Sequence, residues 1–307
     1  MTDAGRTVRE YQSRLSREHQ QRERYRANLR RHAKRLRFAW IEGHDTLYKF
    51  KSMAGNGCSE VQDMIENSRI YFSIPDQFND PFDCAPVCKP AKPLSDPAFI
   101  QELLADEERM MGESGKSPEE VEELRKSQVD VLQLGPAVTA QTRSVMRADV
   151  RMFCLTSRQD HPLQWAHYAD SHRGVCLHFR CKFGTLLGLA RAVKYRKVRE
   201  PVLVPLNYNP SPDHIADRMV QIKADFWRYE SEYRIIGHDG ADWGYTLDGR
   251  FCSFPPEQLC GVTLGMGTGA ADRQLIMSWA ANHVPALRVY EAVEDPDQFG
   301  LRIRWIA

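Results

Sequence analysis

The chain has 307 residues, of which 42% are hydrophobic and 27% charged, and its formal net charge is +1. These values are ordinary for a soluble globular protein, and no run approaches the roughly 18 apolar residues that a membrane-spanning helix requires. The N-terminal stretch "MTDAGRTVREYQSRL" lacks the apolar centre of a secretion signal. We therefore expect a cytoplasmic protein with no membrane partner.

The first forty residues form a basic head. Residues 1–40 contain twelve Arg or Lys and four Asp or Glu, a balance of +8, so the rest of the chain carries −7. Apolar residues at alternating spacings of three and four predict one amphipathic helix from about Thr7 to Leu36. We favour a helix that packs on its own body or on a partner. The alternative is a surface for a protein or nucleic-acid acceptor.

The remaining residues, 41–307, are predicted to form a single domain in which strands and helices are interspersed. The patterns predict, in chain order, a strand at 45–53, a helix at 59–68, a strand at 69–74, turns at 75–83, a helical insertion at about 96–148, strands at 150–157, 174–179, 191–195, 233–236 and 259–265, a helix at 269–283, and strands at 286–293 and 301–306. Regular βαβ alternation is lacking. The pattern therefore predicts an α+β fold of mixed small sheets rather than a doubly wound sheet.

The cysteines and histidines suggest no metal. None of the eight cysteines forms a C-x-x-C pair, so we expect reduced thiols, several of them buried. Cysteine and histidine crowd residues 154–178, but their spacing matches no zinc-ligand pattern. A metal-dependent nuclease also fits poorly, because no carboxylate cluster has metal-ligand spacing.

Two segments allow both a structural and a functional interpretation. In "PLQWAHYADSHRGVCLHF" (162–179), Trp165, His167 and Tyr168 suit a flat polar ligand, on which rings stack and which imidazole and hydroxyl groups orient. They equally suit a short helix with Trp165 and Tyr168 buried. In "FNDPFD" (78–83) we favour a turn anchored to the core by Phe78 and Phe82 over a direct ligand contact.

The stretch "FWRYESEYRII" (226–236) carries the main candidate for chemistry. On a strand, Glu230, Glu232 and Arg234 project from one face, and Tyr233 and Ile235 from the other. Two close carboxylates repel unless a cation intervenes, and Arg234 could supply that cation. Such a cluster can stabilise an oxocarbenium-like transition state, as glycosidic cleavage requires. The alternative is a charge ladder in solvent.

Six blocks in order resemble a bacterial family. "LYKFKSM", "YFSIPDQFNDPFD", "FCLTS", "LQWAHYADSHRGVCLHF", "VKY" and "FWRYESEYRII" are similar to the blocks of the domain-of-unknown-function family number twenty-nine seventy-one, from about residue 46 to 267. The layout of that family is in turn similar to that of ADP-ribosyltransferase-like proteins, in which an opening strand holds NAD, a middle strand ends in Ser or Tyr, and a late strand supplies the catalytic glutamate.

The resemblance implies a role for each matching position. Tyr48 and Lys49 would lie near NAD, Ser157 would end the middle strand, and Glu232 or Glu230 would be catalytic. One departure is Lys49, since ADP-ribosyltransferase-like proteins often have His or Arg there, and lysine cannot reproduce their geometry.

The resemblance further implies a central cleft between two small sheets, with the nicotinamide stacked on Trp165 or Tyr168, beside His167 and Arg234. The expected activity is NAD cleavage with transfer of ADP-ribose to a macromolecule or to water, in a setting such as a toxin or phage defence. The alternative is a non-catalytic module that binds a nucleotide or a partner through the basic head.

Overall fold

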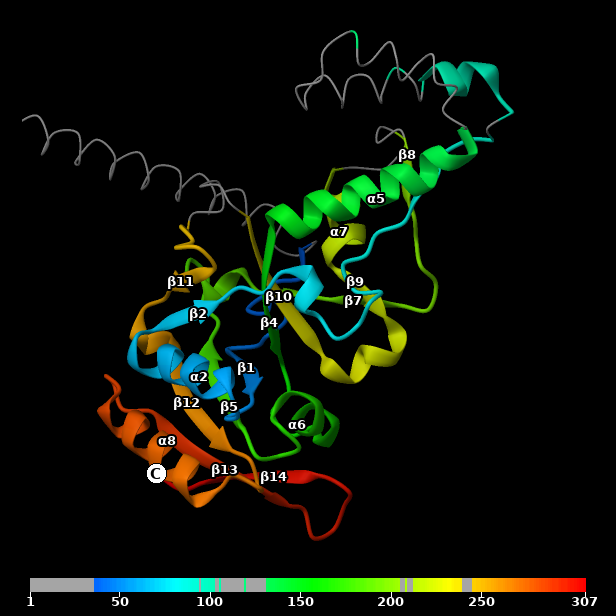
Figure 1. The fold of residues 1–307 in the computed structure, drawn as a ribbon. Coiled ribbons are helices and arrows are strands. Elements are labelled where there is room, and N and C mark those ends of the chain that lie inside the picture. The colour runs from blue at the N-terminus through cyan, green and yellow to red at the C-terminus, as the bar shows by residue number, and fades with distance from the viewer. Residues whose placement is uncertain are drawn as a thin grey trace, which may run out of the picture. The chain divides into compact units, whose positions relative to one another are not determined.

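The computed structural model describes residues 36–93, 95–102, 105, 119, 131–204, 208, 212–238 and 245–307. The predicted basic helix, apart from Leu36, and much of the predicted insertion lie outside these ranges. The chain divides into two compact units: unit 1 comprises residues 1–73, 150–193 and 228–307, and unit 2 comprises residues 74–149 and 194–227. Helices and strands are mixed in both (Figure 1), which confirms the predicted mixture of α and β structure.

Unit 1 is built on an eight-stranded sheet, larger than the small sheets that the sequence suggested. The strand order is β14-β13-β12-β5-β1-β4-β10-β6. The strands are β1 (Thr46–Lys51), β4 (Val150–Thr156), β5 (Val175–Arg180), β6 (Arg191–Ala192), β10 (Glu232–His238), β12 (Leu259–Leu264), β13 (Arg288–Glu294) and β14 (Leu301–Trp305). The pairing is antiparallel except between β12 and β13.

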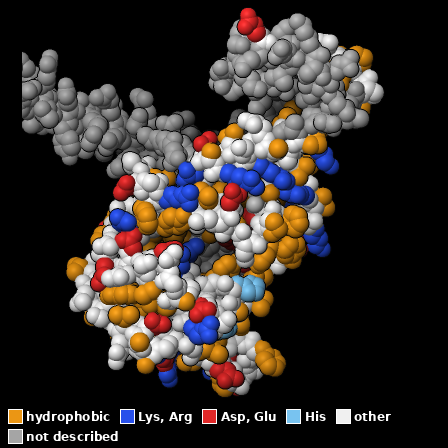
Figure 2. All heavy atoms as spheres, viewed as in Figure 1, with side chains coloured by type: hydrophobic (Ala, Val, Ile, Leu, Met, Phe, Trp, Pro, Cys, Tyr) orange, Lys and Arg blue, Asp and Glu red, His pale blue; other side chains and the backbone are white. Residues whose placement is uncertain are grey.

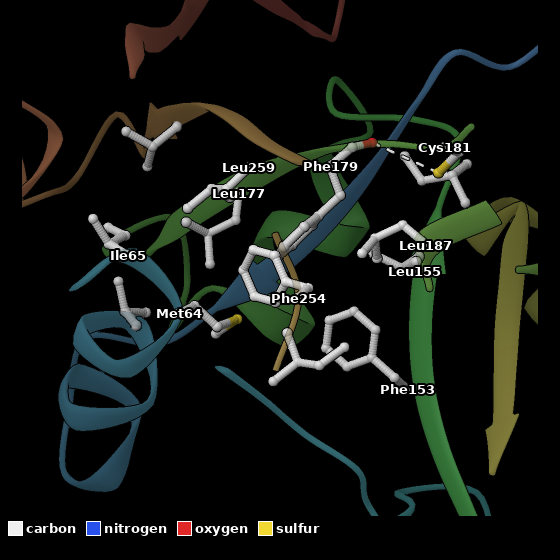
Figure 3. Close-up of a cluster of buried hydrophobic side chains, with 14 of the residues drawn as sticks. Met64, Ile65, Phe153, Leu155, Leu177, Phe179, Cys181, Leu187, Phe254 and Leu259 are labelled. Atoms are coloured by element: carbon white, nitrogen blue, oxygen red, sulfur yellow. Dashed lines mark hydrogen bonds between the residues drawn. The ribbon is translucent and has the colours of Figure 1, made fainter. Parts of the chain in front are cut away.

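One face of this sheet carries the main hydrophobic core. Alternate residues of β4 and β5, such as Phe153, Leu155 and Leu177, meet side chains of helix α2 (Asn56–Glu66), including Met64 and Ile65 (Figure 3). Helix α8 (Ala270–Asn282) adds further apolar side chains to the same cluster. Burial of this area from water is the main stabilising term of the unit.

The opposite face carries a second, smaller cluster. It contains Phe50 and Cys176 from the sheet and Trp165 from helix α6 (Pro162–Tyr168). Because strand side chains alternate between faces, Tyr48 and Phe50 project toward α6, while Leu47 projects into the main core. The two clusters thus divide the sheet into a core face and an α6 face.

Smaller elements complete the two units. In unit 1, β2 (Arg69–Tyr71) pairs with β11 (Phe251–Ser253), and η2 (Leu187–Leu189) and η6 (Pro256–Gln258) are 3-10 turns. Unit 2 contains η1 (Pro75–Gln77), α5 (Val131–Asp149), α7 (Pro212–Val220), the parallel pair β3 (Cys88–Pro90) and β8 (Val202–Val204), and the parallel pair β7 (Lys194–Arg196) and β9 (Ile222–Ala224). The 3-10 helix η4 (Asp225–Glu230) precedes β10.

The turn at 78–83 folds as predicted in its backbone, but Phe82 does not lie as predicted. The Asp80 carboxylate accepts a hydrogen bond from the Phe82 N–H at 2.9 Å, and the Asp83 N–H donates to the Asp80 carbonyl at 3.1 Å. The predicted anchoring of Phe82 in the core is wrong, because this side chain is 61% exposed. The Arg199 guanidinium lies over its ring, 5.7 Å from the centroid.

Surface charges of both signs are interspersed with hydrophobic side chains over the visible face (Figure 2). Many are exposed ion pairs of the kind formed by Arg158 and Asp160, each of which contributes little to stability. Within the described ranges no helix is long and apolar enough to cross a membrane.

Gly174 leads into β5 at a position where a side chain has no room. A Cβ atom there would lie 2.1 Å from the Lys51 carbonyl oxygen, whereas one at Gly300 would meet nothing within 4 Å. We expect Gly174→Ala to lower the free energy of unfolding by about 1–3 kcal/mol, because the backbone must shift to accept the methyl group. Urea unfolding measures this, with Gly300→Ala as the control. Equal stability of the two variants would contradict the tight approach of Gly174 to β1.

Candidate functional site

Three strands bring Tyr48, Thr156 and Glu232 into one row across the sheet. Tyr48 of β1 is the register partner of Thr156 of β4, which in turn is the partner of Glu232 of β10. Directly opposed residues of antiparallel strands project to the same face. The row therefore lies on the α6 face, and it joins two segments that the sequence analysis had placed near a ligand.

Of the strands that this row crosses, β1 and β4 are only loosely joined. Tyr48 and Thr156 are the one register pair between β1 and β4, whereas β4 and β10 share seven. Near the start of β4, Met152 instead exchanges two backbone hydrogen bonds of 2.8 Å with Ser73. Lys49 Nζ donates to the Cys154 carbonyl at 2.8 Å, which satisfies an acceptor that the diverging strands leave unpaired.

Helix α6 packs against the sheet face that carries this row and is held by its tryptophan. Trp165 is fully buried, with its ring edge-to-face with Phe50 at 4.9 Å and stacked on His172 at 6.3 Å. Its indole N–H donates to the Gln159 carbonyl at 2.8 Å. Since its side chain has no exposed surface, Trp165 is a core residue, and of the two predicted stacking rings the half-buried Tyr168 is the accessible one.

Glu232 and Arg234 form a buried ion pair. Arg234 Nε lies 2.7 Å from Glu232 Oε1 and a terminal nitrogen lies 3.1 Å from Oε2, a two-point contact that fixes both groups. The side chains are 6% and 0% exposed. Burial and the neighbouring Glu232 raise the pKa of the Cys154 thiol to about 12. Cys154 is therefore a thiol and not a thiolate at neutral pH, so it is a poor nucleophile.

Glu230 lies elsewhere than predicted. The expectation that it shares a strand with Glu232 and Arg234 is wrong: residues 225–230 form the 3-10 helix η4, and Ser231 has a positive φ of 46°. Glu230 therefore does not share a strand face with Glu232 and Arg234. It is nevertheless buried on the α6 side, where the Tyr168 hydroxyl donates to its Oε1 at 2.5 Å.

The other predicted site residues are His167, Ser157 and Lys49. His167 is exposed, and its Nδ1 lies 2.9 Å from the Tyr229 hydroxyl. Ser157 follows β4, and its backbone N–H donates to the Ser231 carbonyl at 3.1 Å. Lys49 projects to the core face, 5.1 Å from the Phe153 ring centroid, and burial followed by the neighbouring Lys51 lowers the pKa of its ammonium group.

Residues that the sequence analysis did not single out complete the site. Thr156, rather than Ser157, occupies the position beside Glu232. The alternation of buried Phe153 and Leu155 in "FCLTS" could have shown that Thr156 faces the other way. Gln164 of α6 lies against Thr156 at 3.1 Å. A single glutamine in a short helix gives no sequence signal of such a role.

A polar network surrounds Tyr48 at the other end of the row. Its ring lies edge-to-face with His178 at 5.0 Å, and its hydroxyl accepts from Gln159 Nε2 at 3.4 Å. His178 Nε2 lies 2.7 Å from the Thr263 hydroxyl, which donates to Gln159 Oε1 at 3.2 Å. Burial raises the pKa of Tyr48 and lowers that of His178 to about 3. Both groups are therefore neutral at pH 7.

His178 should make the fold sensitive to mild acid. Its folded pKa lies below that of a histidine in the unfolded chain, about 6.5, so only the unfolded state takes up a proton between roughly pH 6.5 and 3 and stability falls as pH falls. Between pH 7 and pH 5 this one group costs about 2 kcal/mol. We expect His178→Gln to lose correspondingly less stability over that interval in urea unfolding. An identical loss in both proteins would contradict this assignment.

The described residues suggest no metal centre: they contain no group of three or more Cys, His, Asp or Glu side chains able to hold an ion. The eight cysteines carry thiols, and five of them are buried: Cys84, Cys88, Cys176, Cys181 and Cys252.

Comparisons with protein-family models, with curated proteins and with solved structures found no match to this chain.

Proposed function

We propose that the chain is an ADP-ribosyltransferase-like enzyme that cleaves NAD at the bond between nicotinamide and ribose. The observation that carries this proposal is the row Tyr48–Thr156–Glu232 on the α6 face, since it brings Tyr48 and Glu232, two positions to which the motif resemblance gives roles, to either side of Thr156. We place the central cleft beside this row, where β1 and β4 share only one register pair.

In this proposal Glu232 stabilises the positive charge that develops on the ribose. The bond between C1′ and the ring nitrogen breaks, and its electron pair leaves with the nicotinamide, which becomes neutral. The Glu232 carboxylate accepts a hydrogen bond from the ribose 2′-hydroxyl and faces the oxocarbenium-like carbon. The pair with Arg234 keeps Glu232 ionised and fixed in direction, because an adjacent guanidinium favours the charged carboxylate.

In this mechanism Glu230 accepts a proton from the acceptor, and Tyr168 contacts both Glu230 and the nicotinamide. A hydroxyl of the acceptor, or water, attacks C1′ and transfers its proton to the Glu230 carboxylate. The hydrogen bond from Tyr168 holds that carboxylate, and the half-buried Tyr168 ring supplies the stacking surface for the nicotinamide. In this mechanism Arg234 holds Glu232, and Lys49 holds the Cys154 carbonyl. Neither of them contacts the ligand.

The experiment is to incubate the full chain with NAD labelled in the nicotinamide. Release of labelled nicotinamide by the wild type, and its loss in Glu232→Gln, would support the proposal. The matched control is Glu66→Gln, an exposed glutamate of α2, which should release nicotinamide at the wild-type rate. Retention of activity in Glu232→Gln would contradict the assignment of Glu232.

A second candidate function is a non-catalytic nucleotide-binding module. The buried two-point pair of Glu232 and Arg234 favours a non-catalytic role for Glu232, because such pairs also serve purely structural roles. Calorimetric titration separates the candidates: NAD that binds and is recovered intact, with every acceptor including water, supports the module.

A further inference from the structure

We infer that Gln164 of helix α6 is a positioning residue that holds the turn between Glu230 and Glu232. Its Nε2 lies 2.6 Å from the Glu230 carbonyl oxygen and 3.3 Å from the Tyr229 carbonyl oxygen. The Thr156 hydroxyl donates to the same Glu230 carbonyl at 2.6 Å. Two side chains from α6 and β4 thus hold the backbone at the point where η4 ends.

The orientation of the Gln164 amide follows from its neighbours. Because two carbonyl oxygens face the same end of the side chain, that end must be the NH₂ group. The Gln164 side chain is 1% exposed, and its Oε1 is buried without a hydrogen-bond partner. A buried acceptor without a partner destabilises the fold. A glutamine is nevertheless explained here, because its amide group donates hydrogen bonds to the Glu230 turn.

The turn requires such support because its backbone is strained. Ser231 adopts φ 46°, a left-handed conformation that costs free energy in a residue with a Cβ. This one residue links η4 to β10, so it sets where the Glu230 and Glu232 carboxylates lie relative to each other. The Ser231 N–H donates to the Arg228 carbonyl and its own carbonyl accepts from Ser157, both at 3.1 Å.

This inference rests on the proposed function for its effect on catalysis, but its structural part can be tested separately. In hydrogen exchange, Gln164→Met should make the Ser231 amide exchange about tenfold faster, while the peptide that covers α8, residues 270–282, stays unchanged. In NAD cleavage the same variant should lower kcat about tenfold and leave KM within about twofold, as expected when a catalytic group is misplaced and binding is kept.

Three further variants complete the test. Gln62→Met, an exposed glutamine of α2, should change neither exchange nor kcat. Thr156→Val removes the second donor to the Glu230 carbonyl and replaces Gln164→Met if that variant does not fold. Thr156→Ser keeps the hydroxyl and should keep the Ser231 amide protected.

The outcomes are separable. Unchanged exchange at Ser231 in both Gln164→Met and Thr156→Val would overturn the positioning role, whatever the activity. A rise in KM with unchanged kcat would also overturn it, because that result indicates a ligand contact. If the wild type cleaves no NAD, the proposed function fails, and faster exchange in the variants still supports the positioning of the turn by Gln164.

Discussion

Replacing Glu232 by glutamine is expected to lower the free energy of unfolding by about 3–5 kcal/mol, apart from any effect on activity. The reason is that Arg234, which is 0% exposed, would keep its charge in the interior without the two-point carboxylate contact. Removing one partner of a buried ion pair is far more costly than removing one at the surface. Urea unfolding of the wild type and Glu232→Gln measures the difference.

The matched control is an ion pair at the surface. Asp160→Asn removes the carboxylate from the pair with Arg158, in which both side chains are 48% exposed, and should cost less than about 1 kcal/mol. If Glu232→Gln is no more destabilising than Asp160→Asn, the buried Glu232–Arg234 pair does not contribute more to the stability of the fold than a surface pair does. The stability data also provide a control for the activity assay, since they define the temperature at which the wild type and Glu232→Gln both remain folded.

The second large effect is expected at Trp165. Trp165→Ala should cost about 3–5 kcal/mol, because it deletes a fully buried indole and leaves a cavity between α6 and Phe50. It also removes the hydrogen bond to the Gln159 carbonyl. Loss of this anchor should loosen α6, so amide exchange in residues 162–168 should rise together with the fall in stability.

Trp305 provides the control for this substitution. It is 66% exposed on β14, and Trp305→Ala should leave the exchange of α6 unchanged and cost much less. A small effect at Trp165, or an equal effect at both tryptophans, would contradict the conclusion that Trp165 holds α6 on the sheet.

The local pattern of the late strand could be predicted, but its beginning could not. Alternation correctly placed Glu232 and Arg234 on one face and Tyr233 and Ile235 on the other, which the structure shows to be the core face. The strand was extended wrongly over Glu230, because the aromatic residues of "FWRYESEYRII" have strand propensity. A 3-10 helix held by long-range hydrogen bonds overrides that propensity here.

Helix boundaries show the same limit. Helix α2 was predicted to begin at Ser59, but it begins three residues earlier, at Asn56, because Gly55 adopts φ 54° and turns the chain there. Nothing local in the sequence reports which glycine takes a left-handed conformation.

The site as a whole depends on strand register, which a sequence pattern does not contain. Tyr48, Thr156 and Glu232 are far apart in the chain and meet only because β1 and β10 flank β4 at matching positions. A shift of one residue would turn each of these side chains to the core face. Alternation could have shown which way Thr156 faces, but its place beside Glu232, and the contact of Gln164 with it, became visible only in the folded chain.

The most direct test of the central claim is a crystal structure of Glu232→Gln with NAD. We expect the nicotinamide riboside to lie against Tyr48, Thr156 and Gln at position 232, with its ring beside Tyr168. NAD bound at another surface, with Tyr48 and the position-232 side chain untouched, would show that the row across β1, β4 and β10 is not the NAD site.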